Sequence, residues 1–368
     1  MAEEKRSFYR GRRVLITGHT GFKGSWLSRI LILAGAQVTG YSLDPPTDPA
    51  LFSLLDLGRE MTDVRGDVRD LERLRRVFAE TEPEVVFHLA AQPIVRESYR
   101  DPVGTYAVNV MGTVHVLECA RHTPSVRSLV NVTTDKVYEN REWEYGYRET
   151  DRLDGYDPYS NSKSCSELVT HSYRQSFFGE DGCAVSTCRA GNVIGGGDFA
   201  VDRILPDCIR AASAGRPVKL RNPGSVRPYQ HVLEPLSLYL KVAAAQYGDR
   251  RFCGNYNVGP DDCDCVTTGE LAELFCRAWG GGASWVGKSD GGPHEANFLR
   301  LDCSRVKSVF GWRPRRHVKE AVEMTAEWFR ALPDGFLSGS GDPAALREAA
   351  CAAARAVTDR QIREFFAE

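Results

Sequence analysis

A tyrosine and a lysine four residues apart are the first candidates for chemistry in this sequence. The stretch DPYSNSKSCSEL contains Tyr159 and Lys163, with Asp157 as a predicted helix cap and Pro158 in the first turn. Residues at positions i and i+4 share one helix face. A phenol has an ordinary pKa of about 10, which a nearby ammonium or oxidised nicotinamide would lower. Tyr159 could then remove a hydroxyl proton. The alternative is an ordinary pair on a solvated helix face.

A hydroxyl, a carboxyl and an amine follow one another as Thr134, Asp135 and Lys136 in SLVNVTTDK, a predicted strand over 128–136. Neighbouring side chains on a strand point to opposite faces, so Asp135 and Lys136 can meet one substrate only beyond the strand end. Oxidation of a hexose at C4 makes its C5 proton acidic. A base can then remove that proton, and an acid can protonate the C6 hydroxyl so that water leaves. A turn role for Asp135 and a surface or phosphate contact for Lys136 are the alternatives.

The glycine-rich segment GHTGFKG lies between a predicted strand, 13–17, and the helical pattern SWLSRILILAGAQV. Gly18, Gly21 and Gly24 would let the backbone turn tightly and approach a pyrophosphate, which a helix N-terminus attracts. In this context the segment predicts a dinucleotide site, although an ordinary glycine-rich turn is the alternative. No arginine directly follows the second predicted strand, QVTGYSL, so NAD is preferred over NADP. Either Asp44 holds the adenosine ribose, or Ser42 occupies the strand end instead.

Further strands are predicted near 66–70, 84–92 and 184–195, with a helical run, TYAVNVMGTVHVLECARH, among them. Alternating strands and helices predict an α/β protein with a Rossmann-type doubly wound parallel sheet and a smaller, mixed α/β C-terminal substrate domain. Ligands in such sheets lie at the carboxyl ends of the strands. The predicted domain boundaries are 1–192 with a returning segment at about 228–262 for the NAD-binding domain, 193–227 with 263–330 for the substrate domain, and 331–368 for a helical tail.

At these residues the sequence resembles the sugar-nucleotide dehydratases of the extended short-chain dehydrogenase family. The resemblance extends to about residue 330 and is carried by these segments: ITGHTGFKGSWL, HLAAQPIVRESYRDP, NVTTDKVYEN, DPYSNSKSCSEL, RAGNVIGGGDFA, RPYQHVLEPL and PHEANFLRLDCS. It is strongest to members that act on CDP-glucose, which show Asp-Lys where members acting on dTDP-glucose show Asp-Glu. It implies a CDP-sugar substrate, dehydrated to its 4-keto-6-deoxy form.

The resemblance also implies roles for individual residues. Thr134, Asp135, Lys136, Tyr159 and Lys163 would be catalytic, but Lys136 can act as the C5 base only if its amine is neutral. Tyr159 or a water molecule is the alternative base. The residues predicted to contact NAD are Gly18, Gly21, Phe22, Lys23, Gly24, Asp44, Asp67, Val68, Leu89, Ala90, Ala91, Asn109, Thr133, Tyr159 and Lys163. The residues predicted to contact the substrate are Gln92, Asn192, Arg203, Arg227, His294 and Arg300. For each arginine a surface ion pair is the alternative.

Two other functions are compatible with these motifs. A sugar-nucleotide 4-epimerase would use the same tyrosine and lysine but would need no acid at Asp135, because no water leaves. A non-catalytic redox sensor could keep the glycine turn, but it would not need Tyr159 and Lys163. The resemblance further implies a homodimer that pairs through a four-helix bundle, formed by helices near 101–121 and 158–178.

The composition restricts the binding partners, location and cysteine chemistry that are expected. The 368 residues have a formal net charge of −2, so no global basic field favours nucleic acid or a membrane surface. The N-terminal MAEEKRSFYRGRR has no apolar core of the kind found in signal peptides, and a cytoplasmic location is expected. The 11 cysteines include no CxxC pair, so free thiols are expected rather than disulfides or structural zinc, and no metal site is predicted.

Overall fold

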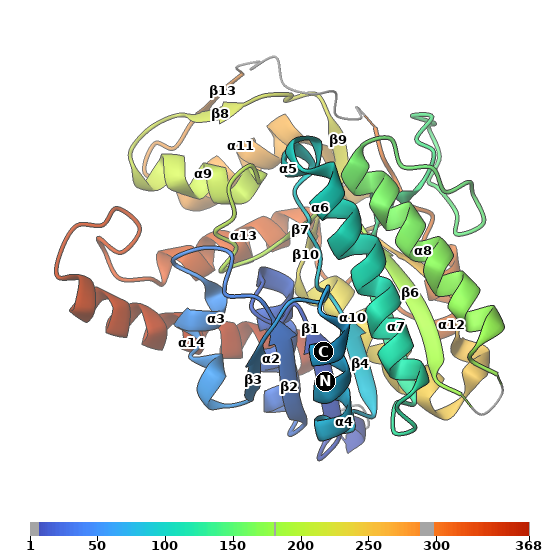
Figure 1. The fold of residues 1–368 in the computed structure, drawn as a ribbon. Helices are drawn as coiled ribbons and strands as arrows, with labels where there is room; N and C mark the ends of the chain where they lie inside the picture. Colours follow the sequence, from blue (N-terminus) through green and yellow to red (C-terminus); the bar gives the residue numbers. More distant parts are fainter. Residues whose placement is uncertain (1–6, 180–181, 288–297, 368) are drawn as a thin grey trace.

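The computed structural model describes residues 7–179, 182–287 and 298–367 (Figure 1). A seven-stranded sheet in the order β11-β6-β5-β4-β1-β2-β3 forms its centre, and every pairing in it is parallel. The strands are β1 (Arg13–Thr17), β2 (Gln37–Ser42), β3 (Thr62–Arg65), β4 (Val85–His88), β5 (Ser128–Thr134), β6 (Ala184–Ala190) and β11 (Asn255–Val258). The strand order reverses between β1 and β4, so a crevice is expected beyond their carboxyl ends. The doubly wound parallel sheet is confirmed.

Helices cover both faces of the sheet (Figure 1). Those that pack on or near the sheet are α2 (Phe22–Leu33), α3 (Leu51–Leu54), α4 (Leu71–Thr81), α5 (Val95–Arg100), α6 (Pro102–Tyr106), α7 (Gly112–Arg121), α8 (Pro158–Ser176) and α10 (Leu233–Gly248). A π-helical turn, η2 (Ala107–Met111), joins α6 to α7. The single helical run predicted for this region is therefore a continuous helical path with one wide turn in it.

The chain beyond β6 alternates between the sheet and a smaller region. This region contains the strand pairs β7 (Val193–Ile194) with β10 (Gln230–His231), β8 (Val218–Leu220) with β13 (Trp285–Gly287), and β9 (Val226–Pro228) with β12 (Cys265–Thr267). Its helices are α9 (Ile204–Ser213), α11 (Thr268–Trp279) and α13 (Val318–Arg330), whereas α12 (Ser304–Phe310) packs on β11 of the sheet. The chain returns to the sheet as β11, which pairs with β6. The predicted domain boundaries stay a prediction.

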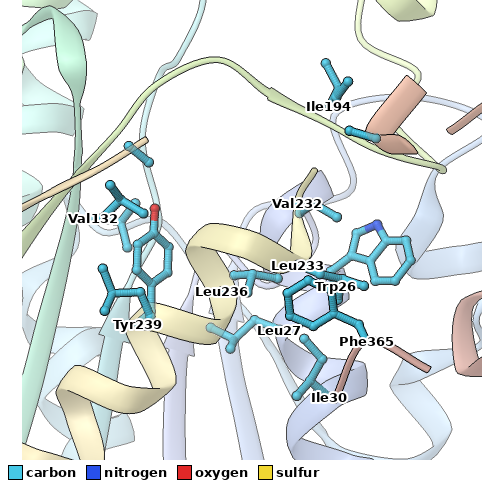
Figure 2. Close-up of a cluster of buried hydrophobic side chains, with 14 of the residues drawn as sticks. Trp26, Leu27, Ile30, Val132, Ile194, Val232, Leu233, Leu236, Tyr239 and Phe365 are labelled. Carbon is cyan, nitrogen blue, oxygen red and sulfur yellow. The ribbon is translucent and has the colours of Figure 1, made fainter. Parts of the chain in front are cut away.

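One face of the sheet packs on α2 and α10. Figure 2 shows Leu233 and Leu236 of α10 among Trp26 and Leu27 of α2, with Val132 of β5 nearby. The Trp26 ring is fully buried, and its Nε1 donates to the carbonyl of Gly196 at 2.9 Å. Burying side chains of this size stabilises the fold by roughly 1.5–3 kcal/mol each. This core fixes α2, whose N-terminus carries the glycine turn.

The C-terminal tail is one long helix, α14 (Pro343–Ala367), packed against the sheet domain. Phe365 is fully buried and joins the core drawn in Figure 2. Thr358 and Gln361 resemble a capping box in sequence, but they lie inside α14 and contact α13 instead. Thr358 accepts a hydrogen bond from Trp328, and Gln361 donates to the carbonyl of Met324.

A buried ion pair joins the tail to α2. Arg29 donates from Nε and Nη2 to the two carboxylate oxygens of Asp359, both at 2.6 Å. Asp359→Ala should lower the free energy of unfolding by about 3 kcal/mol, because Arg29 would keep a buried charge with less compensation. Urea unfolding of the unchanged protein and of Asp359→Ala measures this difference in the free energy of unfolding. Glu364→Ala, an exposed acid on the same helix, is the control and should change it by less than about 0.5 kcal/mol. Equal losses in both variants would contradict the prediction.

Candidate active site

A cavity of about 1040 Å³ lies beyond the carboxyl ends of β1, β4, β5 and β6. It collects residues that are far apart in the sequence because parallel strands end at the same edge of the sheet. The predicted site residues that border it are Gly18, Gly21, Phe22, Lys23, Gly24, Asp44, Asp67, Val68, Leu89, Ala90, Ala91, Thr133, Thr134, Asp135, Lys136, Tyr159, Lys163, Asn192, Arg203 and Arg227. The volume is large enough for more than one drug-sized ligand.

The glycine turn forms a tight cradle at one end of the cavity. Gly18 has a φ of +77°, and a Cβ atom there would lie 2.7 Å from the backbone nitrogen of Ala90. A Cβ atom at Gly24 would lie 2.1 Å from the carbonyl oxygen of Gly18. Gly21 caps α2 without a side-chain hydrogen bond, so the first amides of the helix are left for a ligand. These features fit the pyrophosphate of a dinucleotide.

Gly24→Ala should weaken binding of the dinucleotide by about 100-fold, because the new methyl group meets backbone and the turn must move. Isothermal titration of the purified protein with NAD measures this. Gly179→Ala is the control, since a Cβ atom there has open space and the affinity should stay the same. An affinity of Gly24→Ala close to that of the unchanged protein would show that the turn does not approach the ligand.

Both candidates for the adenosine ribose border the cavity. Ser42 ends β2, and its Oγ lies 2.9 Å from Oγ1 of Thr20. Asp44 lies beyond the strand with a side chain that is 91% exposed, and its Oδ1 is 3.4 Å from Nη1 of Arg65. Arg65 arrives from the end of β3 and is held mainly by Asp63 at 2.8 Å. An arginine therefore lies near this end of the cavity, although none directly follows β2 in sequence.

Tyr159 and Lys163 lie on the first two turns of α8, as the spacing predicts. Pro158 is the first helical residue, and the Asp157 carboxylate accepts a hydrogen bond from the backbone nitrogen of Ser160 at 3.0 Å. Lys163 Nζ donates to the carbonyl of Val132 at 3.2 Å, which fixes α8 to β5. Both side chains border the cavity.

The pKa of Tyr159 differs from the expectation that a nearby ammonium lowers it. Burial raises the pKa of Tyr159 to about 12, although a hydrogen bond with Thr134 partly offsets this. Burial also lowers the pKa of Lys163 to about 8, and Glu167 opposes that change. The phenol is therefore protonated at neutral pH in the ligand-free protein. A cation bound beside Tyr159 would be needed to favour the phenolate.

Asp135 and Lys136 lie just past the end of β5, in the short 3-10 helix η3 (Asp135–Val137), as expected. Asp135 is buried, and its Oδ1 accepts a hydrogen bond from Thr134 Oγ1 at 3.0 Å. Its Oδ2 has no hydrogen-bond partner among the described residues. Burial raises the pKa of Asp135, which Lys136 and Arg227 partly offset. A protonated carboxyl group at the cavity is what a general acid requires.

Several cavity residues were not assigned from sequence, or were assigned only in part. Lys23 was predicted as a cofactor contact, yet its amine lies among Arg203, Lys163 and Asp135, and burial lowers its pKa to about 7. This places a second amine near Asp135. Cavity residues missed entirely include Arg96, Asp198, Lys219, Arg221, Asn222 and Thr268. Most of them lie in short elements with no periodic pattern, whereas Arg96 and Asp198 lie inside segments that carry the resemblance and so had a usable signal.

Three of the predicted residues that the structure describes, Gln92, Asn109 and Arg300, are not among those that border the cavity. Asn109 accepts a hydrogen bond from the backbone nitrogen of Gln92 at 2.9 Å and donates to the carbonyl of Gln92 at 3.1 Å. The Gln92 side chain bonds Thr105 and the backbone of Ile94, so both residues shape the loop that carries Leu89 to Ala91. Arg300 packs over the ring of Phe298 at 4.9 Å. His294 lies outside the described residues.

The cysteines are all free thiols, as expected. One of them, Cys263, lies with Asp264 and His317 in a cluster whose potential ligand atoms are within 4.8 Å of one another. Asp264 already bonds the backbone nitrogen of Val318 at 2.8 Å and His317 Nδ1 at 2.9 Å, so its two oxygens hold the start of α13.

Comparison with known proteins gives the family. A family model described as GDP-mannose 4,6 dehydratase matches residues 15–256. The chain belongs to this dehydratase family. Within the family, it is 48% identical over 332 residues to the CDP-glucose 4,6-dehydratase of Salmonella typhimurium, covering 89% of this chain and 92% of that relative. It is 30% identical over 336 residues to the UDP-glucose 4-epimerase of Mycolicibacterium smegmatis, covering 86% of this chain and 98% of that relative.

Solved structures with the same fold include a UDP-glucose 4-epimerase from Thermus thermophilus in complex with NAD. It is 27% identical, with a TM-score of 0.74, and covers 86% of this chain and 99% of its own. A dTDP-glucose 4,6-dehydratase from Streptomyces venezuelae with bound NAD is 25% identical, also with a TM-score of 0.74. The match covers 86% of this chain and 97% of the Streptomyces protein. Among the described residues of this family member, no helix is both long and apolar enough to cross a membrane.

Proposed function

We propose that the protein is an NAD-dependent CDP-glucose 4,6-dehydratase that produces CDP-4-keto-6-deoxyglucose for deoxysugar biosynthesis. The observation that carries the proposal is Asp135. Its carboxyl group is buried at the cavity, keeps one oxygen without a hydrogen-bond partner among the described residues, and lies beside Thr134 near Tyr159. An oxidation site needs only the phenol, whereas loss of water also needs an acid. The relative at 48% identity has the same printed activity.

The chemistry follows from the positions of these groups. Tyr159 takes the proton of the C4 hydroxyl as the C4 hydrogen leaves with its electron pair, and Thr134 bonds the same oxygen. When bound at the glycine turn, NAD would supply the acceptor for that hydride and its return to C6. After C4 becomes a ketone, a base removes the C5 proton, Asp135 protonates the departing C6 hydroxyl, and C5 takes back a proton as the hydride reaches C6. Lys136 borders the cavity as the first candidate for this base, with Tyr159 and a water molecule as the alternatives.

The residues that would hold the sugar nucleotide are Asn192, Arg203 and Arg227, which border the cavity. Arg227 is a buried guanidinium that donates to the carbonyl of Val226 at 2.9 Å. Charge-assisted hydrogen bonds from such arginines suit a diphosphate. The choice of CDP rests on sequence similarity, because relatives that act on other nucleotides are only 24–30% identical to this chain.

A 4-epimerase is the second candidate, favoured by the 30% identical relative. The two functions are separated by CDP-glucose that carries deuterium at C4. A dehydratase transfers the deuterium to C6 and forms a 4-keto sugar with an alkaline chromophore. An epimerase returns the deuterium to C4 and forms no such product. No turnover of CDP-, dTDP-, UDP- or GDP-glucose would overturn the proposed function as a whole.

The proposal includes a homodimer in the cytoplasm. Helices α6, α7 and α8 run along one side of the molecule (Figure 1), within the two predicted bundle regions. Apolar side chains exposed on or beside these helices are Tyr99, Val103, Met111, Leu168 and Phe177. A self-complementary surface of this kind supports pairing with a second copy. Sedimentation should show a dimer that Leu168→Glu converts to a monomer, and a monomeric unchanged protein would contradict the pairing.

The free thiols of the cysteines suit a reducing compartment, which supports the proposed cytoplasmic location.

A further inference from the structure

Glu167 is a buried acid behind the cavity that the proposed mechanism does not use. It lies one turn beyond Lys163 on α8, so Tyr159, Lys163 and Glu167 share one helix face at spacings of four. Three side chains hold its carboxylate. Thr133 donates to Oε1 at 2.5 Å, and Thr187 and Arg189 donate to Oε2 at 2.7 and 2.9 Å.

The neighbours of Glu167 keep it ionised and fixed. Burial disfavours the charge, but Arg189 and the hydrogen bonds from Thr133 and Thr187 outweigh it and lower the pKa of Glu167. Arg189 is fully buried and also donates to Tyr138 Oη at 2.8 Å. The carboxylate is therefore held from β5 through Thr133 and from β6 through Thr187 and Arg189. The charge is carried by α8 and bound by side chains of two strands, so its position is fixed.

Lys163 needs a partner of this kind. Within the described part of the chain, the only hydrogen bond of its Nζ goes to the neutral carbonyl of Val132. Burial lowers its pKa to about 8, and Glu167 is the acid whose charge opposes that effect. The other titratable groups facing it give no support. His88 on β4 is neutral, since burial lowers its pKa to about 3, and Lys23 on α2, whose pKa is lowered to about 7, repels Lys163 in its charged form.

We propose that Glu167 is a positioning residue that keeps Lys163 cationic beside Tyr159, with Arg189 and Thr133 holding it in place. This inference rests on the proposed function for its catalytic meaning. The ammonium favours the phenolate that removes the hydroxyl proton, so the charge of Glu167 acts on the reaction through Lys163.

The test measures the protonation of Lys163 directly in the ligand-free protein. Protein with ¹³Cε-labelled lysine is titrated by NMR, and the Lys163 signal is assigned as the one missing in Lys163→Met. Glu167→Gln should move the titration of Lys163 to lower pH by roughly one unit. Thr170→Val, which removes a buried hydroxyl on the same helix without changing a charge, should leave the titration in place.

Glu167→Gln leaves Arg189 as a buried, unpaired charge, so it could fail to fold. Glu167→Gln with Arg189→Met removes the attraction of the acid together with the repulsion of the buried arginine, so it should show a downward shift that is smaller than that of Glu167→Gln alone. An unchanged titration in either folded variant overturns the inference, as does an equal shift in Thr170→Val. If the shift occurs but the unchanged protein turns over no nucleotide-activated glucose, the effect of Glu167 on Lys163 stands and the proposed function fails.

Discussion

Asp135→Asn is expected to stop the loss of water while leaving oxidation at C4 possible. Asparagine has the shape of aspartate and can keep the hydrogen bond with Thr134, but it has no acidic proton to give to the departing hydroxyl. Formation of the 4-keto-6-deoxy product should fall by about 10²–10⁴-fold, the usual contribution of a general acid. Reduced nicotinamide should accumulate instead, because no alkene forms to take the hydride back. Single-turnover absorbance, together with the alkaline chromophore of the product, measures both quantities.

The pH dependence gives a second expectation for the same residue. The acid must be protonated, so turnover should fall as pH rises through the raised pKa of Asp135. A raised folded-state pKa also means that Asp135 destabilises the fold once it ionises, so Asp135→Asn should raise the unfolding midpoint of the ligand-free protein at neutral pH. Asp154→Asn, a half-exposed acid before α8, is the control and should change neither quantity. Unimpaired dehydration by Asp135→Asn would show that a group other than Asp135 is the acid.

Tyr159→Phe should prevent the first step. Removing the phenolic oxygen removes the group that accepts the C4 hydroxyl proton, and a general base contributes about 10²–10⁴-fold. Neither reduced nicotinamide nor product should then form, in contrast to Asp135→Asn, which stops after oxidation. Because the base must lose its proton from a pKa of about 12 in the ligand-free protein, the rate of oxidation at C4 by the unchanged enzyme should rise with pH.

The control for Tyr159→Phe is Tyr156→Phe. Tyr156 lies three residues earlier, just before α8, and its side chain is 81% exposed. Its loss should leave oxidation within about twofold of the unchanged protein. If Tyr159→Phe kept more than about a tenth of the oxidation rate, a different group would be the base and the spacing of Tyr159 and Lys163 would have only a structural meaning.

Local signals predicted the elements that carry the chemistry. Pro158 after a capping Asp157 starts α8 where expected, because both features act within one turn of the chain. The glycine turn lies between β1 and α2, and β5 ends at Thr134, so Asp135 and Lys136 leave the strand together. In the tail, Thr358 and Gln361 have the spacing of a capping box but lie inside α14, where Thr358 accepts a hydrogen bond from Trp328.

The sequence by itself determined the order of strands and helices, the dinucleotide turn and the identity of the phenol, the amine and the acid, since each depends on spacings of a few residues. The tertiary structure alone decided how those groups are charged. Burial raises the pKa of Tyr159 and Asp135 and lowers that of Lys23 and Lys163, and the desolvation responsible comes from strands and loops far away in the sequence. The pairing of Glu167 with Arg189 likewise exists only because α8 packs on β6. Spacing sets which groups can meet, whereas the dielectric around them is a property of the whole fold.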